Sequence, residues 1–188
     1  AAFYAIYHGP EGVKRIALRT HRLAAILAAG LRKLGIRVEH DAFFDTVVAR
    51  VADADAVMAR ARALGVNLRD FGDRRDRARG AQDNRICIAT AETTTADDLV
   101  RVWTAFAGGD KPAFGAAELD AATPNAIPAA LARATPFLTH PVFNSHHSET
   151  AMMRFLKRLE DRDLALNRAM IPLGSCTMKL NATAEMLP

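Results

Sequence analysis

The stretch PEGVKRIALRTHRLAAILAAGLRKLG at residues 10–35 decides the fold of this chain. Its apolar positions recur at three- and four-residue spacing, which is typical of a helix with one buried face. They are Val13, Ile16, Ala17, Thr20, Leu23, Ala24, Leu27, Leu31 and Leu34. Pro10 is tolerated in a first helical turn, and Gly35 is typical of a residue just beyond a helix end. The spacing predicts a long amphipathic helix over 10–34, packed on a sheet.

The following hundred residues alternate strand and helix signals. FFDTVVARV at 43–51 predicts a strand, and Asp53 predicts the N-cap of a helix that ends before Gly65. VNLRDF at 66–71 and RICIAT at 85–90 predict a pair of hairpin strands. Thr95 and Asp98 have the spacing of a capping box before a helix through Ala107. The fold class predicted is α/β (α+β): a two-layer αβαββα sandwich with helices on one face of a small sheet.

The composition changes after this region. Residues 108–134 are rich in glycine, proline and alanine, which predicts a linker with one short helix near 127–133. Residues 135–188 predict a mostly helical or irregular arm, in which Ser148 caps a helix and Glu149 favours its first turn. The methionines of that helix are interpreted as packing residues.

Charge and composition narrow the function classes. The net charge is +4, but the arginines are interleaved with acidic residues and only 6% of the residues are aromatic, so nucleic-acid binding is the weakest hypothesis. No apolar run reaches the roughly 18 residues of a membrane helix, and no signal peptide is recognisable. Cys87 and Cys176 stand far apart, which favours a reducing, cytoplasmic location.

Chemically reactive side chains gather late in the chain. LTHPVFNSHHSET at 138–150 holds three histidines, but it lacks the HExxH spacing, and no metal site is predicted. IPLGSCTMKLN at 171–181 combines hydroxyl, thiol and ammonium groups behind one glycine. A nucleophilic Cys176 with His147 as base and a phosphate-binding loop both remain open from the residues alone.

The closing sequence PLGSCTMKLNATAEMLP, with LTHPVFNSHHSETAMMRFLKRLEDRDLALNRAMI before it, closely resembles the glycine decarboxylase family, the P-protein of the glycine cleavage system. YAIYHGPEGVKRIALRTHRLA and the ETTT at 92–95 are similar to the same family. The resemblance therefore covers nearly the whole chain, and its closing motif is the most specific part.

The resemblance implies a pyridoxal-phosphate enzyme made of two homologous halves, each like a fold-type-I enzyme. Residues 1–107 would then form the small C-terminal domain of the first half, 108–134 the linker, and 135–188 the incomplete N-terminal arm of the second half. The family's cofactor lysine follows a histidine and precedes a glycine-rich loop. None of the five lysines here does so, namely Lys14, Lys33, Lys111, Lys157 and Lys179. We therefore expect a central fragment that is inactive alone, holds no catalytic residue and binds no cofactor by itself.

The resemblance also implies the parent's chemistry and partners. The parent decarboxylates glycine and passes the aminomethyl group to the lipoyl arm of H-protein, as a homodimer, with no nucleic acid and no membrane involved. Candidate pocket-lining residues, toward cofactor or substrate, are Ser175, Cys176, Thr177 and Lys179; His147, Ser148 and Glu149 are candidates for support. Two further hypotheses remain: an autonomous α/β module that binds a small ligand or a protein, and a basic nucleic-acid-binding domain.

Overall fold

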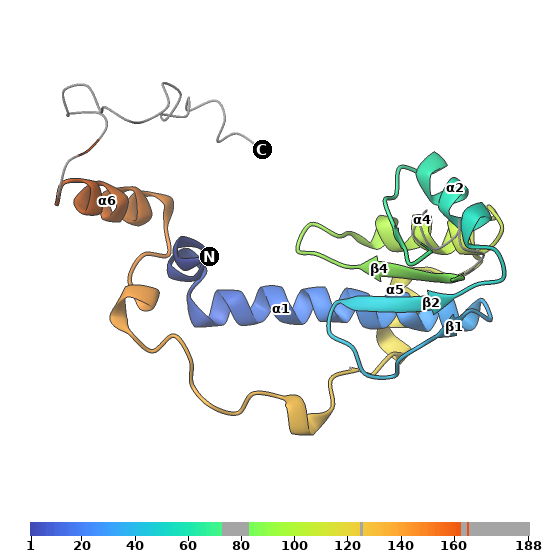
Figure 1. The fold of residues 1–188 in the computed structure, drawn as a ribbon. Helices are drawn as coiled ribbons and strands as arrows, with labels where there is room; N and C mark the ends of the chain where they lie inside the picture. Colours follow the sequence, from blue (N-terminus) through green and yellow to red (C-terminus); the bar gives the residue numbers. More distant parts are fainter. Residues whose placement is uncertain (73–82, 125, 163–164, 166–188) are drawn as a thin grey trace. The chain divides into compact units, whose positions relative to one another are not determined.

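The structure, a computed structural model, describes residues 1–72, 83–124, 126–162 and 165. The chain divides into two compact units (Figure 1). The sheet unit comprises residues 13–135, and the terminal unit comprises residues 1–12 with 136–188.

The sheet unit has mixed α/β structure, as the sequence predicts. Its elements are the main part of α1 (Ala2–Lys33), β1 (Arg37–Val38), β2 (Thr46–Arg50), α2 (Ala54–Ala63), β3 (Arg69–Asp70), β4 (Arg85–Ala89), α4 (Ala96–Phe106), α5 (Ala116–Ala122) and the 3₁₀ turn η1 (Ala129–Leu131). Within the described residues, the four strands form one antiparallel sheet in the order β1-β2-β4-β3. β2 and β4 run side by side at its centre (Figure 1).

The sheet buries one face only. Burial alternates along the two central strands, so that Val47, Ala49, Ile86 and Ile88 are buried and their neighbours are exposed or half-buried. The buried side chains join one core with residues of α1, α2 and α4. This alternation is typical of an antiparallel sheet with one solvated face. The predicted arrangement, with helices on one face of a small sheet, is confirmed.

The contact between α1 and α4 rests on a glycine. Trp103 is fully buried and its indole N–H donates to the carbonyl oxygen of Leu27 at 3.1 Å. A Cβ atom on Gly30 would lie 2.3 Å from the Trp103 ring. The indole therefore packs directly on the backbone of α1, and only glycine leaves room for it.

Four consecutive residues of α1, Arg19 to Arg22, hold three loops at one end of the sheet. Arg19 donates to the carbonyl oxygens of Glu92 and Thr94, at 2.7 and 2.8 Å. The backbone oxygen of Thr20 accepts from the Thr90 hydroxyl at 3.0 Å. Both ring nitrogens of the buried His21 are bonded, Nδ1 to the oxygen of Phe44 and Nε2 to the N–H of Ala126. The Arg22 side chain pairs with Asp120 at 2.5 Å. These polar contacts connect α1 to the loops before β2, after β4 and after α5, and to α5 itself.

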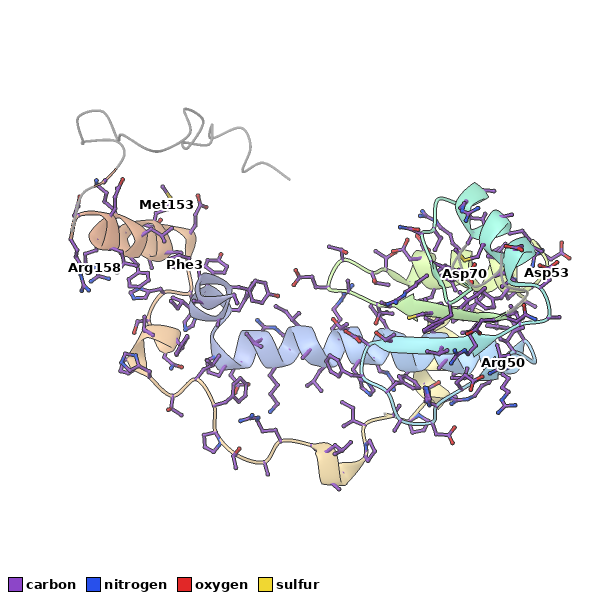
Figure 2. All side chains as sticks on the ribbon, viewed as in Figure 1. Phe3, Arg50, Asp53, Asp70, Met153 and Arg158 are labelled. Carbon is purple, nitrogen blue, oxygen red and sulfur yellow. The ribbon has the colours of Figure 1, made fainter. Side chains whose placement is uncertain are left out.

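The predicted helix ends are confirmed. The Asp53 side chain accepts from the N–H of Ala56 and caps α2, as Figure 2 illustrates at the start of that helix. Thr95 and Asp98 form the predicted capping box of α4, with each side chain bonded to the other's backbone N–H. α1 kinks at Gly9, whose φ is 64°, and its main segment starts at Pro10 as predicted.

Four elements differ from the sequence-based expectations. β1 was not predicted, and the strand predicted over 66–71 is ordered as a strand only at Arg69–Asp70, where it pairs with β4 as expected. The predicted linker contains α5, whose Leu119 is buried in the core. The short helix expected near 127–133 is the single turn η1.

Replacing Gly30 with alanine tests the contact between α1 and Trp103. Alanine normally stabilises a helix interior by about 1 kcal/mol relative to glycine. Here we expect the opposite sign, a loss of about 2 kcal/mol or more in the free energy of unfolding, because the added methyl group overlaps the indole. Urea unfolding followed by tryptophan fluorescence measures it. Gly115→Ala is the control, since a Cβ there meets open space. Equal midpoints for the two variants would contradict the packing argument.

The capping box of α4 predicts an acid-sensitive contribution to stability. Hydrogen bonds from the side chain and backbone of Thr95 lower the pKa of Asp98. Because the pKa is lower in the folded state, this contribution is present above the unfolded pKa, near 4, and is lost as the pH falls through the folded value. In Asp98→Asn, the free energy of unfolding is therefore expected to decrease less steeply than in the wild type as the pH falls below about 5. Unfolding midpoints measured between about pH 2 and 7 check this. The neighbouring variant Asp97→Asn, which has no bond to Thr95, is expected to keep the wild-type slope.

Candidate functional site

The predicted site residues fall in two groups. Ser175, Cys176, Thr177 and Lys179 lie outside the described residues, so their pocket-lining role stays a prediction. His147, Ser148 and Glu149 are described and lie together at the start of α6 (Glu149–Glu160), in the terminal unit. The candidate site therefore consists of His147, Ser148, Glu149 and the residues in contact with them.

Ser148 begins α6 as predicted. Its hydroxyl oxygen accepts from the N–H of Ala151 at 3.2 Å, which satisfies one of the free donors of the first turn. Glu149 occupies that first turn, where a carboxylate is favoured by the helix dipole. These two residues thus have a local role that the sequence alone accounts for.

His147 makes a contact that the sequence does not indicate. Its Nδ1 lies 2.8 Å from the carbonyl oxygen of Tyr7. Because a carbonyl only accepts, Nδ1 carries the proton, and the lone pair of the neutral ring is on Nε2. The bond connects the start of α6 to the first segment of α1, which is 140 residues away in sequence. An exposed imidazole held in this tautomer can accept a hydrogen bond or a proton at Nε2.

Gly9 makes room for this histidine. A Cβ atom on Gly9 would lie 2.4 Å from Cε1 of His147 and 3.0 Å from the carbonyl oxygen of Phe143, the third residue of the 3₁₀ turn η2 (Pro141–Asn144). The φ of 64° also favours glycine. The Gly9–Pro10 dipeptide is a typical turn signal, and it is the feature of the sequence from which this kink could have been predicted.

Aromatic side chains surround the same segment. The His8 ring lies between Tyr4 and Tyr7, with ring centroids 4.3 and 5.3 Å away. His146 stacks on Phe155 of α6 at 4.3 Å. Phe3 and Met153 are 50% and 62% exposed, and both project from their helices in Figure 2. The terminal unit therefore carries histidine and aromatic rings on the two segments that the bond between His147 and Tyr7 connects.

The histidines of this segment are engaged in separate tasks. His140 accepts from the N–H of Val142 and caps η2, while His146 stacks and His147 bonds to the backbone. Within the described residues, no group of three or more His, Cys, Asp or Glu side chains could hold a metal ion. Searched over the same residues, no helix is long and apolar enough to cross a bilayer.

Cys87 does not have the environment of a nucleophile. It is a free, half-buried thiol on β4, and burial raises its pKa above the ordinary value. A raised pKa keeps the sulfur protonated at neutral pH, whereas a nucleophilic cysteine needs the thiolate.

Two ion-paired carboxylates near the sheet, Glu39 and Asp83, have lowered pKa values. The main cause is a hydrogen bond from Arg50 to Glu39 and from Arg85 to Asp83.

The family model of the glycine cleavage system P-protein matches residues 1–106, more than half of the chain. Among curated relatives, glycine dehydrogenase (decarboxylating) of Gluconobacter oxydans is 55% identical over 191 residues, covering 100% of this chain and 19% of the relative. Proteins of the same name from a Bradyrhizobium species and from Xanthomonas axonopodis are each 54% identical over 189 residues, covering 18% of the relative. The chain belongs to the glycine cleavage system P-protein family, and it spans about a fifth of the length of these relatives.

Replacing Gly9 with alanine tests the His147 contact. The added methyl group overlaps the imidazole, so we expect the bond to Tyr7 to break and the Nδ1–H tautomer to lose its preference. Long-range ¹H–¹⁵N spectra of the histidine rings report the two nitrogen shifts of His147. Gly35→Ala is the matched control, since its φ is also positive, 75°, but a Cβ there meets nothing within 4 Å. An unchanged His147 spectrum in Gly9→Ala would refute the assignment.

Proposed function

We propose that this chain is the central part of a glycine dehydrogenase (decarboxylating). The whole protein would release carbon dioxide from glycine and pass the aminomethyl group to the lipoyl arm of H-protein. The observation that carries the proposal is identity of 53–55% with relatives of that name along the whole chain. The proposal also includes a homodimer. It includes a cytoplasmic location as well, and the free Cys87 thiol is the observation that supports this location.

The proposed domains follow from the family's two homologous halves. Residues 1–107 would be the small C-terminal domain of the first half, in the manner of fold-type-I pyridoxal-phosphate enzymes, and 135–188 the arm of the second half. The one-sided antiparallel sheet and the family match over 1–106 support the first assignment. Residues 108–134 would join the halves. Contacts of Asp120 with Arg22, and of Glu118 with Lys33, hold the first part of that segment on the sheet unit.

The described lysines do not fit a covalent cofactor site. Lys33 pairs with Glu118 at 2.6 Å and lies over the Phe114 ring. Lys157 pairs with two carboxylates of α6, which raise its pKa, the opposite of what a reactive amine needs. Lys14 and Lys111 are exposed. Pyridoxal phosphate, which acts as an electron sink when bound, would therefore be held by a lysine outside the described residues.

The candidate site residues take supporting roles in this proposal. Ser175, Cys176, Thr177 and Lys179 would line the pocket for cofactor or substrate. His147, Ser148 and Glu149 would support that lining, because Ser148 sets the start of α6 and His147 ties it to the Gly9 kink. Nε2 of His147 would hold a polar neighbour at a defined position.

Glycine–bicarbonate exchange tests the proposal. The full-length protein, supplied with pyridoxal phosphate and lipoylated H-protein, is expected to exchange label from bicarbonate into glycine. Residues 1–188 alone are expected to show no exchange. Borohydride reduction followed by peptide mass spectrometry is expected to find the pyridoxyl group on a lysine beyond these residues. Absence of exchange by the full-length protein would contradict the function, and a pyridoxyl group on any of the five lysines of this chain would contradict the assignment of the cofactor lysine.

A further inference from the structure

The open face of the sheet carries a row of arginines. Arg37, Arg50 and Arg85 stand directly opposite one another on β1, β2 and β4. They lie on the face opposite the core, because their neighbours Ala49 and Ile86 are buried. Like charges placed directly across antiparallel strands destabilise a sheet, so the row is unfavourable unless something compensates it.

The chain compensates this charge only in part. Arg50 donates to Glu39 at 2.6 Å, and Arg85 to Asp83 at 2.6 Å. On β3, Arg69 lies 5.5 Å from the centre of the Phe71 ring, which Arg85 approaches from 4.8 Å. Across the described part of the chain, no carboxylate forms an ion pair with Arg37 or Arg69, although the charge of Arg37 contributes to the lowered pKa of Glu39. Asp45 lies near enough to act on the Cys87 thiol, so the four guanidinium groups outnumber the nearby described carboxylates Glu39, Asp83 and Asp45 by one.

An apolar row lies beside the arginines. The register places Val48 opposite Cys87, and Cys87 opposite Arg69. Val48 and Cys87 are half-buried, and the thiol stays neutral because burial raises its pKa. Arginine and aromatic side chains are enriched in protein–protein interfaces, and this face combines its arginines with the neighbouring Phe71 ring.

We propose that this open sheet face, defined by Arg37, Arg50, Arg69, Arg85, Val48 and Cys87, binds an acidic segment of a protein. Carboxylates of the partner pair with Arg37 and Arg69, and an apolar side chain of the partner covers Val48 and Cys87. Charge complementarity with the net positive face selects an acidic partner. The proposal concerns the face away from the core and does not depend on the proposed function.

Features of the face favour a protein over a nucleic acid. Phe71 is approached by two guanidinium groups, so its ring is not free to stack on a base. A partner with spaced carboxylates and apolar side chains fits both the charges and the apolar row.

The probe is a labelled 12-residue peptide of alternating glutamate and valine. Its affinity for the 188-residue chain is measured by fluorescence anisotropy. Reversing two charges with Arg37→Glu and Arg69→Glu is expected to weaken binding about tenfold. The control pair Arg15→Glu and Arg62→Glu makes the same change in net charge at exposed positions of α1 and α2, the helices that contribute to the core on the other face of the sheet. This pair is expected to change binding less than about twofold. Arg37→Gln with Arg69→Gln, a milder pair, is expected to give an intermediate loss.

Cys87 provides a second measurement at the face itself. In a Cys176→Ser background, the glutamate–valine peptide is expected to slow alkylation of Cys87 by iodoacetamide, because the bound segment covers the thiol. The proposal is overturned if the peptide does not bind, if both charge-reversed pairs lose affinity equally, if Cys87 reacts at the same rate with and without peptide, or if a duplex DNA of equal charge binds more tightly than the peptide.

Discussion

The fold depends on the close approach of α4 to α1 at Gly30. Trp103 is the largest buried side chain, and its indole packs on the helix backbone and donates to the oxygen of Leu27. A buried indole N–H without a hydrogen-bond partner would lower the free energy of unfolding. Because Gly30 has no side chain, the indole can approach the helix backbone closely enough to donate to the oxygen of Leu27. This contact sets the distance between the two helices, and the sheet then covers the apolar surface that they share.

The two faces of the sheet carry different kinds of side chain, because only one face is buried. The inner face is filled by aliphatic side chains from β2 and β4, with no charged group among them. The outer face carries arginines at matching register positions, two of them neutralised within the chain. The buried core of the sheet unit thus lies on one face, and the acidic partner that we propose would bind the other. The proposed pocket-lining and supporting roles, in contrast, concern the terminal unit and the closing motif.

Family membership and structure address different questions about this chain. The relatives carry the name glycine dehydrogenase (decarboxylating), and this chain spans a fifth or less of their length, so an activity of the whole protein is a proposal and not a finding. The structure contributes what the family name does not contain. It shows the Gly9 kink that accepts His147, the tautomer that the Tyr7 carbonyl imposes, and the environment that keeps Cys87 protonated. None of these depends on a bound cofactor.

Local features of the fold could be predicted from the sequence because their causes are local. The helix beginning at Pro10, the Asp53 cap, the box of Thr95 with Asp98 and the Ser148 cap each depend on residues within one turn. Other features required the tertiary structure. The two-residue strand β1 is ordered by pairing with β2, and α5 by burial of Leu119, neither of which a short window of sequence contains. His147 and Tyr7, like Trp103 and Leu27, meet only because the folded chain brings distant segments together. By itself, then, the sequence determined α2, α4, α6 and the main segment of α1, their caps and the family, whereas α5 and the long-range contacts that shape the candidate site were decided by packing.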